Sequence, residues 1–480
     1  MAMINLDKIL QAKFGFKTFK TGQKEILTAL LAQQSTLAIL PTGGGKTLIY
    51  QMMGAVRDGL VIIVTPLLSL MQDQVARLNY LGEKNVIALN STLTFENKKN
   101  VLKHLKQYHF LFISPEMLNQ EQVQIALKQV PINLMVIDEV HTMVTWGQDF
   151  RPDYLALPAI HKQLDQPQLL LLTATATPSM ITAIIENFRS VPKKWFVYQQ
   201  PVDRPNIFLH TEQLPNEFEK KQRLKYLLQT TSGPGVVYFT SRKLATSMAE
   251  WLTDETGQRV VAYHAGMTAM ARYRVQQQFM QGEIDVITAT SAFGMGIDKE
   301  NIRFVIHYHL SNDLSNYLQE IGRAGRDGQQ SAAILLYVPG DESIQFNLID
   351  QTIPDSYAIK SYVEQSEVTI LTPEQIRLLD FYKSNQLTTV EISRIFDNRR
   401  RIRQNNLLSM INYVKSDGQL RYQISDYFGN ETDGLSQTDE SVGVTDWHPK
   451  ELHLERKEDD KHQLKVLNWS EQLKKLFNLQ

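Results

Sequence analysis

The stretch Pro41-Thr42-Gly43-Gly44-Gly45-Lys46-Thr47 decides the fold of this 480-residue chain. It follows the apolar run Leu37–Leu40 and precedes a helical pattern over Leu48–Val56, so a strand, a loop and a helix are expected in that order. Glycines let successive backbone N–H groups converge on phosphate oxygens, and the helix N-terminus adds the positive end of its dipole. The sequence therefore predicts a phosphate-binding loop in which residues 42–47 hold a nucleotide.

Two residues of this loop have predicted roles in catalysis. Lys46 would neutralise the β- and γ-phosphates, and the hydroxyl of Thr47 would bind Mg²⁺. The chain departs from the general pattern at Leu40, where a first glycine is usual. A glycine-rich turn with an incidental Lys-Thr pair is the alternative, and the context of strand, loop and helix favours the phosphate-binding interpretation.

A pair of carboxylates follows a second apolar run, Leu134–Ile137. Side chains just after such a strand lie at the carboxyl edge of a parallel sheet, where open α/β sheets bind ligands. Asp138 would hold Mg²⁺, and Glu139 would orient and polarise the attacking water. Alone, the pair could be the solvated start of a loop; together with Lys46 it predicts a site for ATP hydrolysis.

Two stretches of the chain alternate short apolar runs with helical patterns, as expected for parallel sheets covered by helices on both faces. The first stretch has five candidate strands: Leu37–Leu40, Val61–Thr65, Leu111–Ile113, Leu134–Ile137 and Leu169–Thr173. The second has five more: Val236–Thr240, Val260–His264, Asp285–Thr290, Phe304–Leu310 and Ala332–Val338. The proline-containing segment Val191–Pro215 is the expected connector, and Ile376–Val414 predicts amphipathic helices. The predicted fold class is therefore α/β, with two tandem parallel-sheet domains followed by a smaller, mainly helical domain.

Composition excludes several classes of function. The 50 Lys and Arg residues nearly balance 51 Asp and Glu residues, so any affinity for nucleic acid must come from local groups. The absence of cysteine excludes disulfides, thiolate metal sites and cysteine nucleophiles. No apolar run reaches the roughly 18 residues of a membrane span, and Met1–Leu10 has no export signal. A cytoplasmic, nucleoid-associated protein that does not bind membranes is expected.

Three further motifs carry a resemblance to a known family. They are the N-terminal segment Phe14–Gln23, the aromatic-rich segment Thr142–Tyr154, and Gln319–Gly328, which holds two arginines. In this order, with the loop and the carboxylates, they resemble the motor of RecQ-type DNA helicases in superfamily 2. The resemblance covers residues 14–328, about two-thirds of the chain. It implies two RecA-like domains of the P-loop NTPase class, at residues 1–207 and 208–342, a helical platform at 343–441, and a polar tail at 442–480.

The resemblance also implies how the nucleotide is bound. Gln23 would hydrogen-bond the adenine edge, Phe16 would stack on the base, and Lys20 stands where the family usually has arginine. Arg326 would be an arginine finger that reaches the γ-phosphate from the second domain, with Arg323 beside it on one helix face. Asp298 would complete the nucleotide site.

Single-stranded DNA is the implied track. Trp146 and Phe150 would stack on bases, Arg151 would pair with a phosphate, and His141 would couple the Mg²⁺ site to this loop. Thr173–Thr177 resembles the motif that couples the two domains. Further contacts to the DNA are expected from residues near strand ends, namely Thr65, Ser69, Ser241, Arg242, His264, Thr288 and Thr290.

The C-terminal part departs from the family, which usually carries a zinc site bound by four cysteines. The corresponding positions hold Gln419, Leu435, Thr438 and Ser441, so zinc is not expected. Arg399, Arg400, Arg401 and Arg403 would form either a platform for duplex DNA or a solvated basic helix. Only 39 residues follow Ser441, too few for both a winged-helix domain and a further helical domain.

The sequence therefore predicts an ATP- and Mg²⁺-dependent DNA helicase that moves 3′→5′ on single strands and acts on forked duplexes in recombination and repair. A monomer is expected, with single-strand-binding or repair proteins as partners. Two alternatives stay open at this point. One is an RNA helicase or remodelling ATPase on the same motor, and the other is a DNA-binding or strand-annealing module with a vestigial ATPase.

Overall fold

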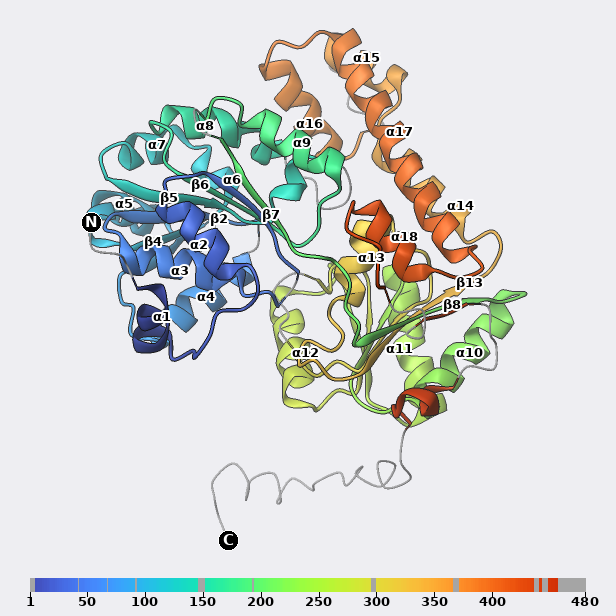
Figure 1. The fold of residues 1–480 in the computed structure, drawn as a ribbon. Coiled ribbons are helices and arrows are strands. Elements are labelled where there is room, and N and C mark those ends of the chain that lie inside the picture. The colour runs from blue at the N-terminus through green and yellow to red at the C-terminus, as the bar shows by residue number, and fades with distance from the viewer. Residues whose placement is uncertain are drawn as a thin grey trace.

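The computed structural model describes residues 5–41, 43–66, 68–90, 93–145, 152–191, 194–294, 299–365, 371–435, 440–442 and 448–455. Two parallel sheets lie in separate lobes, and a group of C-terminal helices stands beside them (Figure 1). None of the helices within the described residues combines the length and the apolar character needed to cross a membrane.

The first lobe contains a parallel sheet of seven strands in the order β3-β4-β2-β5-β6-β1-β7. The strands are β1 (Thr36–Ile39), β2 (Leu60–Val64), β3 (Val86–Leu89), β4 (Phe110–Ile113), β5 (Ile132–Ile137), β6 (Leu169–Thr173) and β7 (Phe196–Gln199). The helices are α1 (Leu6–Ile9), α2 (Gln23–Leu31), α3 (Lys46–Val56), α4 (Leu68–Tyr80), α5 (Phe95–Lys103), α6 (Pro115–Leu118), α7 (Glu121–Leu127), α8 (Leu157–Gln163) and α9 (Pro178–Asn187), with short turns η1 (Leu10–Phe14), η2 (Leu105–Gln107), η3 (Val140–Met143) and η4 (Pro152–Ala156).

Successive residues of the central strands enter two different cores. Leu37 and Ile39 of β1 pack in one apolar cluster, whereas Ala38 and the following Leu40 pack in another. Because side chains of a strand point alternately to opposite faces, an uninterrupted apolar run means that both faces are covered by helices. The carboxyl edge of the sheet is therefore the part of it left for polar function.

The second lobe repeats this arrangement with the order β10-β11-β9-β12-β13-β8-β14, again all parallel. Its strands are β8 (Ile207–Gln213), β9 (Gly235–Tyr238), β10 (Val260–Tyr263), β11 (Val286–Ala289), β12 (Phe304–His307), β13 (Ser331–Tyr337) and β14 (Glu440–Val442). Its helices are α10 (Glu217–Thr230), α11 (Arg242–Thr256), α12 (Ala269–Gln281) and α13 (Leu314–Ile321).

All ten predicted strands are confirmed, but β3, β7, β8 and β14 were not predicted. The prediction that Val191–Pro215 is only a connector is wrong, because β7 and β8 lie within it. The second half of β8 reads as polar, yet His210 and Glu212 are buried. Burial is possible there because Nε of Arg223 donates to the Glu212 carboxylate at 2.9 Å.

The C-terminal helices pack on the second lobe. They are α14 (Glu342–Thr352), α15 (Ser356–Gln365), α16 (Pro373–Ser384), α17 (Thr389–Val414) and α18 (Leu420–Tyr427), followed by the short turn η5 (Pro449–Leu452). The predicted helical stretch divides into α16 and α17, and each of these begins with a capping box, at Thr372 and Thr388. The rings of Tyr413 on α17 and Tyr317 on α13 lie 5.4 Å apart, so the helices and the second sheet share one core.

Candidate functional site

The glycine loop leads from β1 into α3 as predicted. Gly45 has φ 76° and directly precedes Lys46, the first residue of the helix. Gly43 and Gly45 both have positive φ, so their backbone conformation favours glycine, and a Cβ at Gly45 would also displace Nε2 of Gln23, which lies 2.3 Å from that position. The backbone N–H of Gly44 donates to the carbonyl of Pro41 at 2.9 Å, which closes the turn. Thr42 lies outside the described residues.

The N-terminal segment supports this loop from the side. Nζ of Lys20 donates to the Gly43 carbonyl at 2.8 Å, and Nε2 of Gln23 donates to the Gly45 carbonyl at 3.1 Å. Oε1 of Gln23 accepts from the Lys20 backbone at 2.9 Å, and the whole side chain is buried. The predicted adenine contact of Gln23 would thus require these bonds to exchange. Phe16 is 48% exposed, so its ring is open to a stacking partner.

The carboxylates follow β5 at the same edge of the sheet. Glu139 has φ 50°, a left-handed conformation that is unusual for a side chain with Cβ and is typical of functional positions. Burial, reinforced by the negative charge of Glu139, raises the pKa of Asp138 to about 6. Burial acts in the same direction on Glu139, but Lys46, His141 and Arg323 outweigh it and hold that pKa below its usual value. Lys46 therefore lies close to both carboxylates.

His141 links this site to the strand beside it. Its Nδ1 is 2.9 Å from Oγ1 of Thr173 on β6 and 3.3 Å from Oε2 of Glu139. Oγ1 of Thr173 lies 2.9 Å from the carbonyl of Thr175, so the contacts continue into the segment before α9. Both of these contacts are made by Nδ1 on the nucleotide side, so a contact of His141 with DNA, which would have to come from the other ring nitrogen, stays a prediction. The Tyr154 hydroxyl donates to the Asp138 carbonyl at 3.0 Å, which joins the end of the aromatic-rich segment to the carboxylates.

Of the two predicted arginines of the second lobe, Arg323 acts on the carboxylates of the first lobe through its charge. Arg323 is 4% exposed and donates to the carbonyl of Gly294, and its charge helps to lower the pKa of Glu139. Arg323 and Arg326 also act together on Tyr238 by opposing the rise in pKa that burial causes there. The predicted helix face is wrong: α13 ends at Ile321, and both arginines lie in the turn that follows. Gly325 in this turn has φ 54°, and a Cβ there would lie 2.4 Å from Nδ2 of Asn206. Asp298 lies outside the described residues.

The residues predicted to contact DNA are only partly brought together. Ser241 and Arg242 are exposed at the start of α11, and Thr290 lines the same cavity as Arg242. His264 is half-buried, with Nε2 at 3.0 Å from Oγ1 of Thr246. The prediction for Thr288 is wrong, because this fully buried hydroxyl donates to the Ala245 carbonyl at 2.9 Å.

The first lobe gives one further correction. Thr65 is 1% exposed and so cannot contact a DNA strand in this conformation. The backbone of Ser69 lies in the first turn of α4. Trp146, Phe150 and Arg151 lie outside the described residues.

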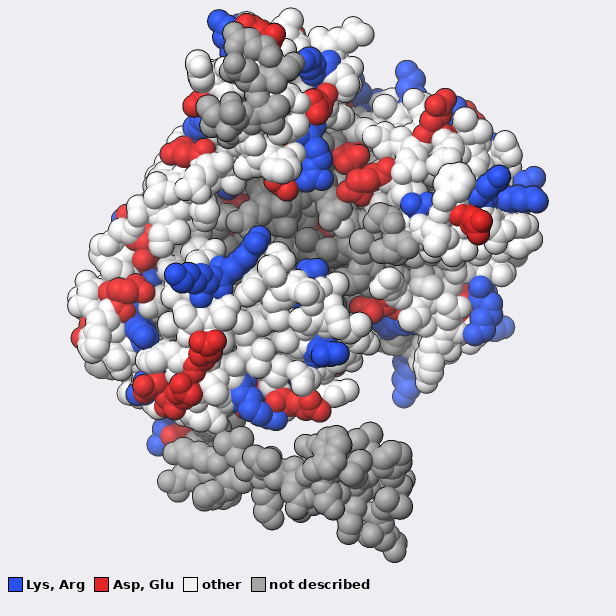
Figure 2. All heavy atoms as spheres, turned by 180° about the vertical axis from the view of Figure 1, so that it is seen from behind, with Lys and Arg blue, Asp and Glu red and all other residues white. Residues whose placement is uncertain are grey.

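A cavity of about 820 Å³ separates the second lobe from the C-terminal helices. Five arginines are among the residues that line it, namely Arg242, Arg272, Arg377, Arg399 and Arg403, against the two carboxylates Glu320 and Glu374. Figure 2 shows this side of the molecule hollowed where the helical region meets the two lobes, with both basic and acidic side chains around the hollow. Arg399 and Arg403 are buried, so the cations open to a phosphodiester backbone in this cavity are Arg242, Arg272 and Arg377.

The basic residues of α17 differ from one another in burial. Arg399 and Arg403 are buried, and the guanidinium of Arg399 lies 4.8 Å from the centre of the Phe396 ring. Arg400 donates to the Ile353 carbonyl at 3.2 Å, and Arg401 donates to Asn398. Arg399, Arg400 and Arg403 are thus used to pack the helical region, whereas Arg401 is exposed on the helix, and the two predicted alternatives stay predictions.

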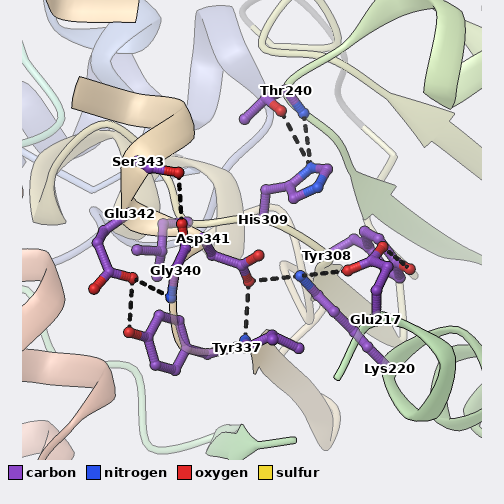
Figure 3. A network of polar contacts seen from close by, with 12 residues as sticks. Glu217, Lys220, Thr240, Tyr308, His309, Tyr337, Gly340, Asp341, Glu342 and Ser343 are labelled. Atoms are coloured by element: carbon purple, nitrogen blue, oxygen red, sulfur yellow. Dashed lines mark hydrogen bonds and ion pairs between the residues drawn. The ribbon is translucent and has the colours of Figure 1, made fainter. Parts of the chain in front are cut away.

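A buried polar network in the second lobe was missed by the sequence analysis (Figure 3). Nζ of Lys220 on α10 lies 2.6 Å from Oδ2 of Asp341 and 4.5 Å from the centre of the Tyr308 ring, and this lysine is fully buried. His309 accepts from Thr240 at the wall of the cavity, because burial and the nearby Lys220 lower the pKa of His309 to about 3. No motif identifies this network, since its members come from different elements.

The positions that correspond to a zinc site hold no metal-binding cluster that the structure can describe. Gln419 precedes α18, Ser441 is in β14, and Thr438 lies outside the described residues. Across the described part of the chain, there is no group of three or more His, Cys, Asp and Glu side chains that could hold a metal ion.

Two parallel-sheet lobes, with a phosphate loop and carboxylates on one and Arg323 of the other acting on those carboxylates, define the class of two-domain P-loop motor ATPases. The family model of the DEAD/DEAH box helicase matches residues 20–184, and that of the helicase conserved C-terminal domain matches residues 219–328. A structure of the Mycobacterium smegmatis helicase Lhr bound to single-stranded DNA and AMP-PNP has a TM-score of 0.57 over 87% of this chain and 58% of that one, at 18% identity. This likeness supports the fold.

Relatives in sequence identify the family. The chain is 37% identical to the probable ATP-dependent DNA helicase RecS of Bacillus subtilis, over 100% of this chain and 99% of that protein. It is 36% identical to the ATP-dependent DNA helicase RecQ of Synechocystis sp., over 69% of this chain and 70% of that protein. The chain belongs to the RecQ family of ATP-dependent DNA helicases. This result favours DNA over the RNA-directed alternative, and active ATP hydrolysis over a vestigial site.

Proposed function

We propose that this helicase hydrolyses ATP between its two lobes and uses their closure to move 3′→5′ along single-stranded DNA. The observation that carries the proposal is the small cavity at which Pro41, beside the phosphate loop of the first lobe, meets Gln319 and Gly322 of the second lobe, next to Arg323. The charge of Arg323 also acts to lower the pKa of Glu139, in keeping with a nucleotide site shared by the two lobes. The proposed lobes are residues 1–207 and 208–342, with the helical platform at 343–441 and the tail at 442–480.

Each catalytic residue has a proposed role. Lys46 and the loop of residues 42–47 hold the phosphates, and Glu139 orients the attacking water. Arg326 is the arginine finger, and Arg323 is its partner at the γ-phosphate. Phe16, Lys20 and Gln23 contact the adenine base of the nucleotide. Asp298 completes the site.

The residues beside the loop fit a bound Mg²⁺. The donors available are the hydroxyl of Thr47 and the carboxylate of Asp138, which are the hard oxygen ligands that Mg²⁺ prefers. Burial disfavours the charged form of Asp138, and a nearby cation would offset that cost. When bound, Mg²⁺ neutralises charge on the β- and γ-phosphates.

The DNA path runs over the second lobe at the exposed start of α11. Ser241 and Arg242 contact phosphates there, and the track continues past Thr290 along the arginine-lined cavity. Trp146, Phe150 and Arg151 stack on the strand or pair with it, and they couple its binding to hydrolysis. The proposed substrates are single-stranded and forked DNA in recombination and repair. The proposed state is a monomer that works on chromosomal DNA of the nucleoid with single-strand-binding or repair proteins.

A strand-displacement assay on 3′-tailed, 5′-tailed and forked duplexes, with and without ATP, tests this function. We expect unwinding of the 3′-tailed and forked substrates that depends on ATP. Unwinding of the 5′-tailed duplex alone would reverse the polarity. Stronger stimulation of ATP hydrolysis by single-stranded RNA than by DNA would overturn the proposed track.

A further inference from the structure

The connector between the two lobes is held by a segment from the far end of the chain. Residues 200–206 lead from β7 in the first sheet to β8 in the second. The guanidinium of Arg421 on α18 is 3% exposed and donates to the carboxylate of Asp203 and to the carbonyls of Arg204 and Ile207. One buried cation therefore binds both the middle and the end of the connector.

The same segment reaches the other end of the connector and the first lobe. Oδ1 of Asn430 accepts from the backbone of Val202 at 2.9 Å, and Nε2 of Gln199 donates to the Phe428 carbonyl at 2.9 Å. A Cβ at Gly429 would lie 2.6 Å from Cγ of Pro178, at the start of α9, so the backbone of Gly429 packs closely against the Pro178 ring. The end of α18 is thus in contact with both lobes.

The connector in turn holds the turn that carries the two arginines of the cleft. The guanidinium of Arg204 donates to the carbonyl of Gly325 at 2.7 Å, and Nδ2 of Asn206 donates to the same carbonyl at 2.8 Å. Gly325 lies between Arg323 and Arg326 in the sequence. A continuous set of polar contacts therefore runs from Arg421, through the connector, to the backbone of the proposed finger.

A small cavity marks the junction where these parts meet. It is lined by Pro41 beside the phosphate loop, by Thr175 after β6, by Gln319 and Gly322 near the end of α13, and by Arg421. Figure 1 shows α18 beside α13, close to the place where the chain crosses between the lobes. Any change in the angle between the lobes must pass through this junction.

We propose that Arg421 is a positioning residue for ATP hydrolysis: it fixes the connector, and the connector fixes the turn that presents Arg323 and Arg326 to the nucleotide. The inference rests on the proposed role of Arg326. The bonds of Arg421 described above go to the connector, so we expect it to act on the geometry of the finger more than on the phosphate loop. Small displacements of a group that must meet the transition state have large effects on rate.

The test replaces Arg421 by methionine, which keeps the length and removes the charge and the donors. We expect kcat of the DNA-stimulated ATPase to fall about tenfold to a hundredfold while KM for ATP changes less than about threefold. Arg421→Lys should recover part of the loss, because a charge returns without the planar fork. The measurement is steady-state phosphate release at saturating single-stranded DNA, below the unfolding temperature of each variant.

The matched control is Arg400→Met. Arg400 is also an arginine of the helical region that donates to a carbonyl and forms ion pairs with carboxylates, yet it is not among the residues that bind the connector. This variant should unfold at a lower temperature with unchanged kcat. Wild-type kcat in folded Arg421→Met would overturn the inference, and so would an equal loss of kcat in Arg400→Met.

A double-mutant cycle tests the same route if Arg421→Met does not fold. Arg421→Lys and Asn206→Ala act on the same set of contacts, so together they should lower kcat by less than the product of their separate effects. A fully multiplicative loss would overturn the proposed route. If Arg326→Ala kept wild-type turnover, the proposed function itself would fail; if only the Arg421 and Asn206 variants were silent, this inference alone would fail.

Discussion

The two sheets of this helicase match strand by strand but use their carboxyl edges in opposite ways. In the two strand orders, β8 takes the place of β1, β12 takes that of β5, and β13 takes that of β6. Lys46 begins the helix after β1, and Lys220 lies in the helix after β8. Lys46 is half-buried beside two carboxylates, whereas Lys220 is fully buried against Asp341 and Tyr308.

The comparison shows what turns such an edge into a nucleotide site. Both lobes place charged residues where an α/β sheet binds ligands. In the second lobe these charges bind each other: Lys220 pairs with Asp341, and His309 bonds to Thr240 beside them (Figure 3). No charge of this pair is then left for a ligand. In the first lobe they face a cleft that the second lobe completes with arginines. Catalysis thus depends on charges placed at the edge of one lobe where the other lobe can add its own.

The largest expected effect comes from the arginine that completes the open site. Arg326→Ala should lower kcat of the DNA-stimulated ATPase by about 10³-fold, because an arginine finger contributes about 10³–10⁵ in rate. Binding of AMP-PNP should stay within a few-fold, since the phosphate loop is on the other lobe. Phosphate release and nucleotide titration measure the two quantities. A loss of nucleotide binding equal to the loss of rate would place Arg326 in ground-state binding instead.

The two lysines separate activity from stability. Lys220→Met should lower the free energy of unfolding by about 3 kcal/mol, because it leaves the buried Asp341 unpaired, with kcat unchanged in the folded protein. Lys46→Met should abolish ATP hydrolysis with little effect on unfolding. Denaturant unfolding and phosphate release provide the measurements. Lys225→Met is the control, because the partly exposed pair of Lys225 with Glu255 should contribute less than about 1 kcal/mol.

The sequence predicted the nucleotide site of the first lobe better than the buried polar network of the second lobe, for a physical reason. A phosphate loop needs glycines next to a lysine, and catalytic carboxylates follow one apolar strand, so both signals are local. Lys220 and Asp341 are 121 residues apart, and each reads as an ordinary surface charge. The strand β14 was missed for the same reason, because it joins β8 only after the chain has passed through the helical region.

Side-chain direction was the other limit. Thr288 and Thr290 look equivalent in the sequence, but Thr288 lies inside β11 and points into the core, whereas Thr290 follows the strand and reaches the cavity. The segment around Arg421 was interpreted as the remnant of a zinc module. Its contacts with the connector could not be predicted, because they depend on how two lobes and a helix meet.

The buried polar network of the second lobe should also make the free energy of unfolding depend on pH. Burial lowers the pKa of His309 from its ordinary 6.5 to about 3, so the unfolded chain binds more protons than the folded one as pH falls below about 6.5. The contribution of His309 is therefore fully present above that pH and is lost below it, by about 2 kcal/mol between pH 7 and pH 5. His309→Asn keeps an acceptor for Thr240 and cannot titrate. Denaturant unfolding at both pH values should show a smaller loss for the variant, and parallel losses would contradict the assignment.

The smallest expected effect tests whether single-stranded DNA runs along the second lobe. Arg242→Ala should weaken binding of single-stranded DNA about three- to tenfold and reduce the slope of log K against log salt by about 0.7, the value for one phosphate contact on a single strand. Fluorescence anisotropy across a salt series measures both quantities. Lys243→Ala is the control, because Lys243 is the adjacent exposed cation on α11 and is not among the residues that line the cavity. Equal changes in slope for the two variants would mean that the DNA strand is attracted by diffuse surface charge. A change confined to the Arg242 variant would place the strand along the carboxyl edge of the second sheet.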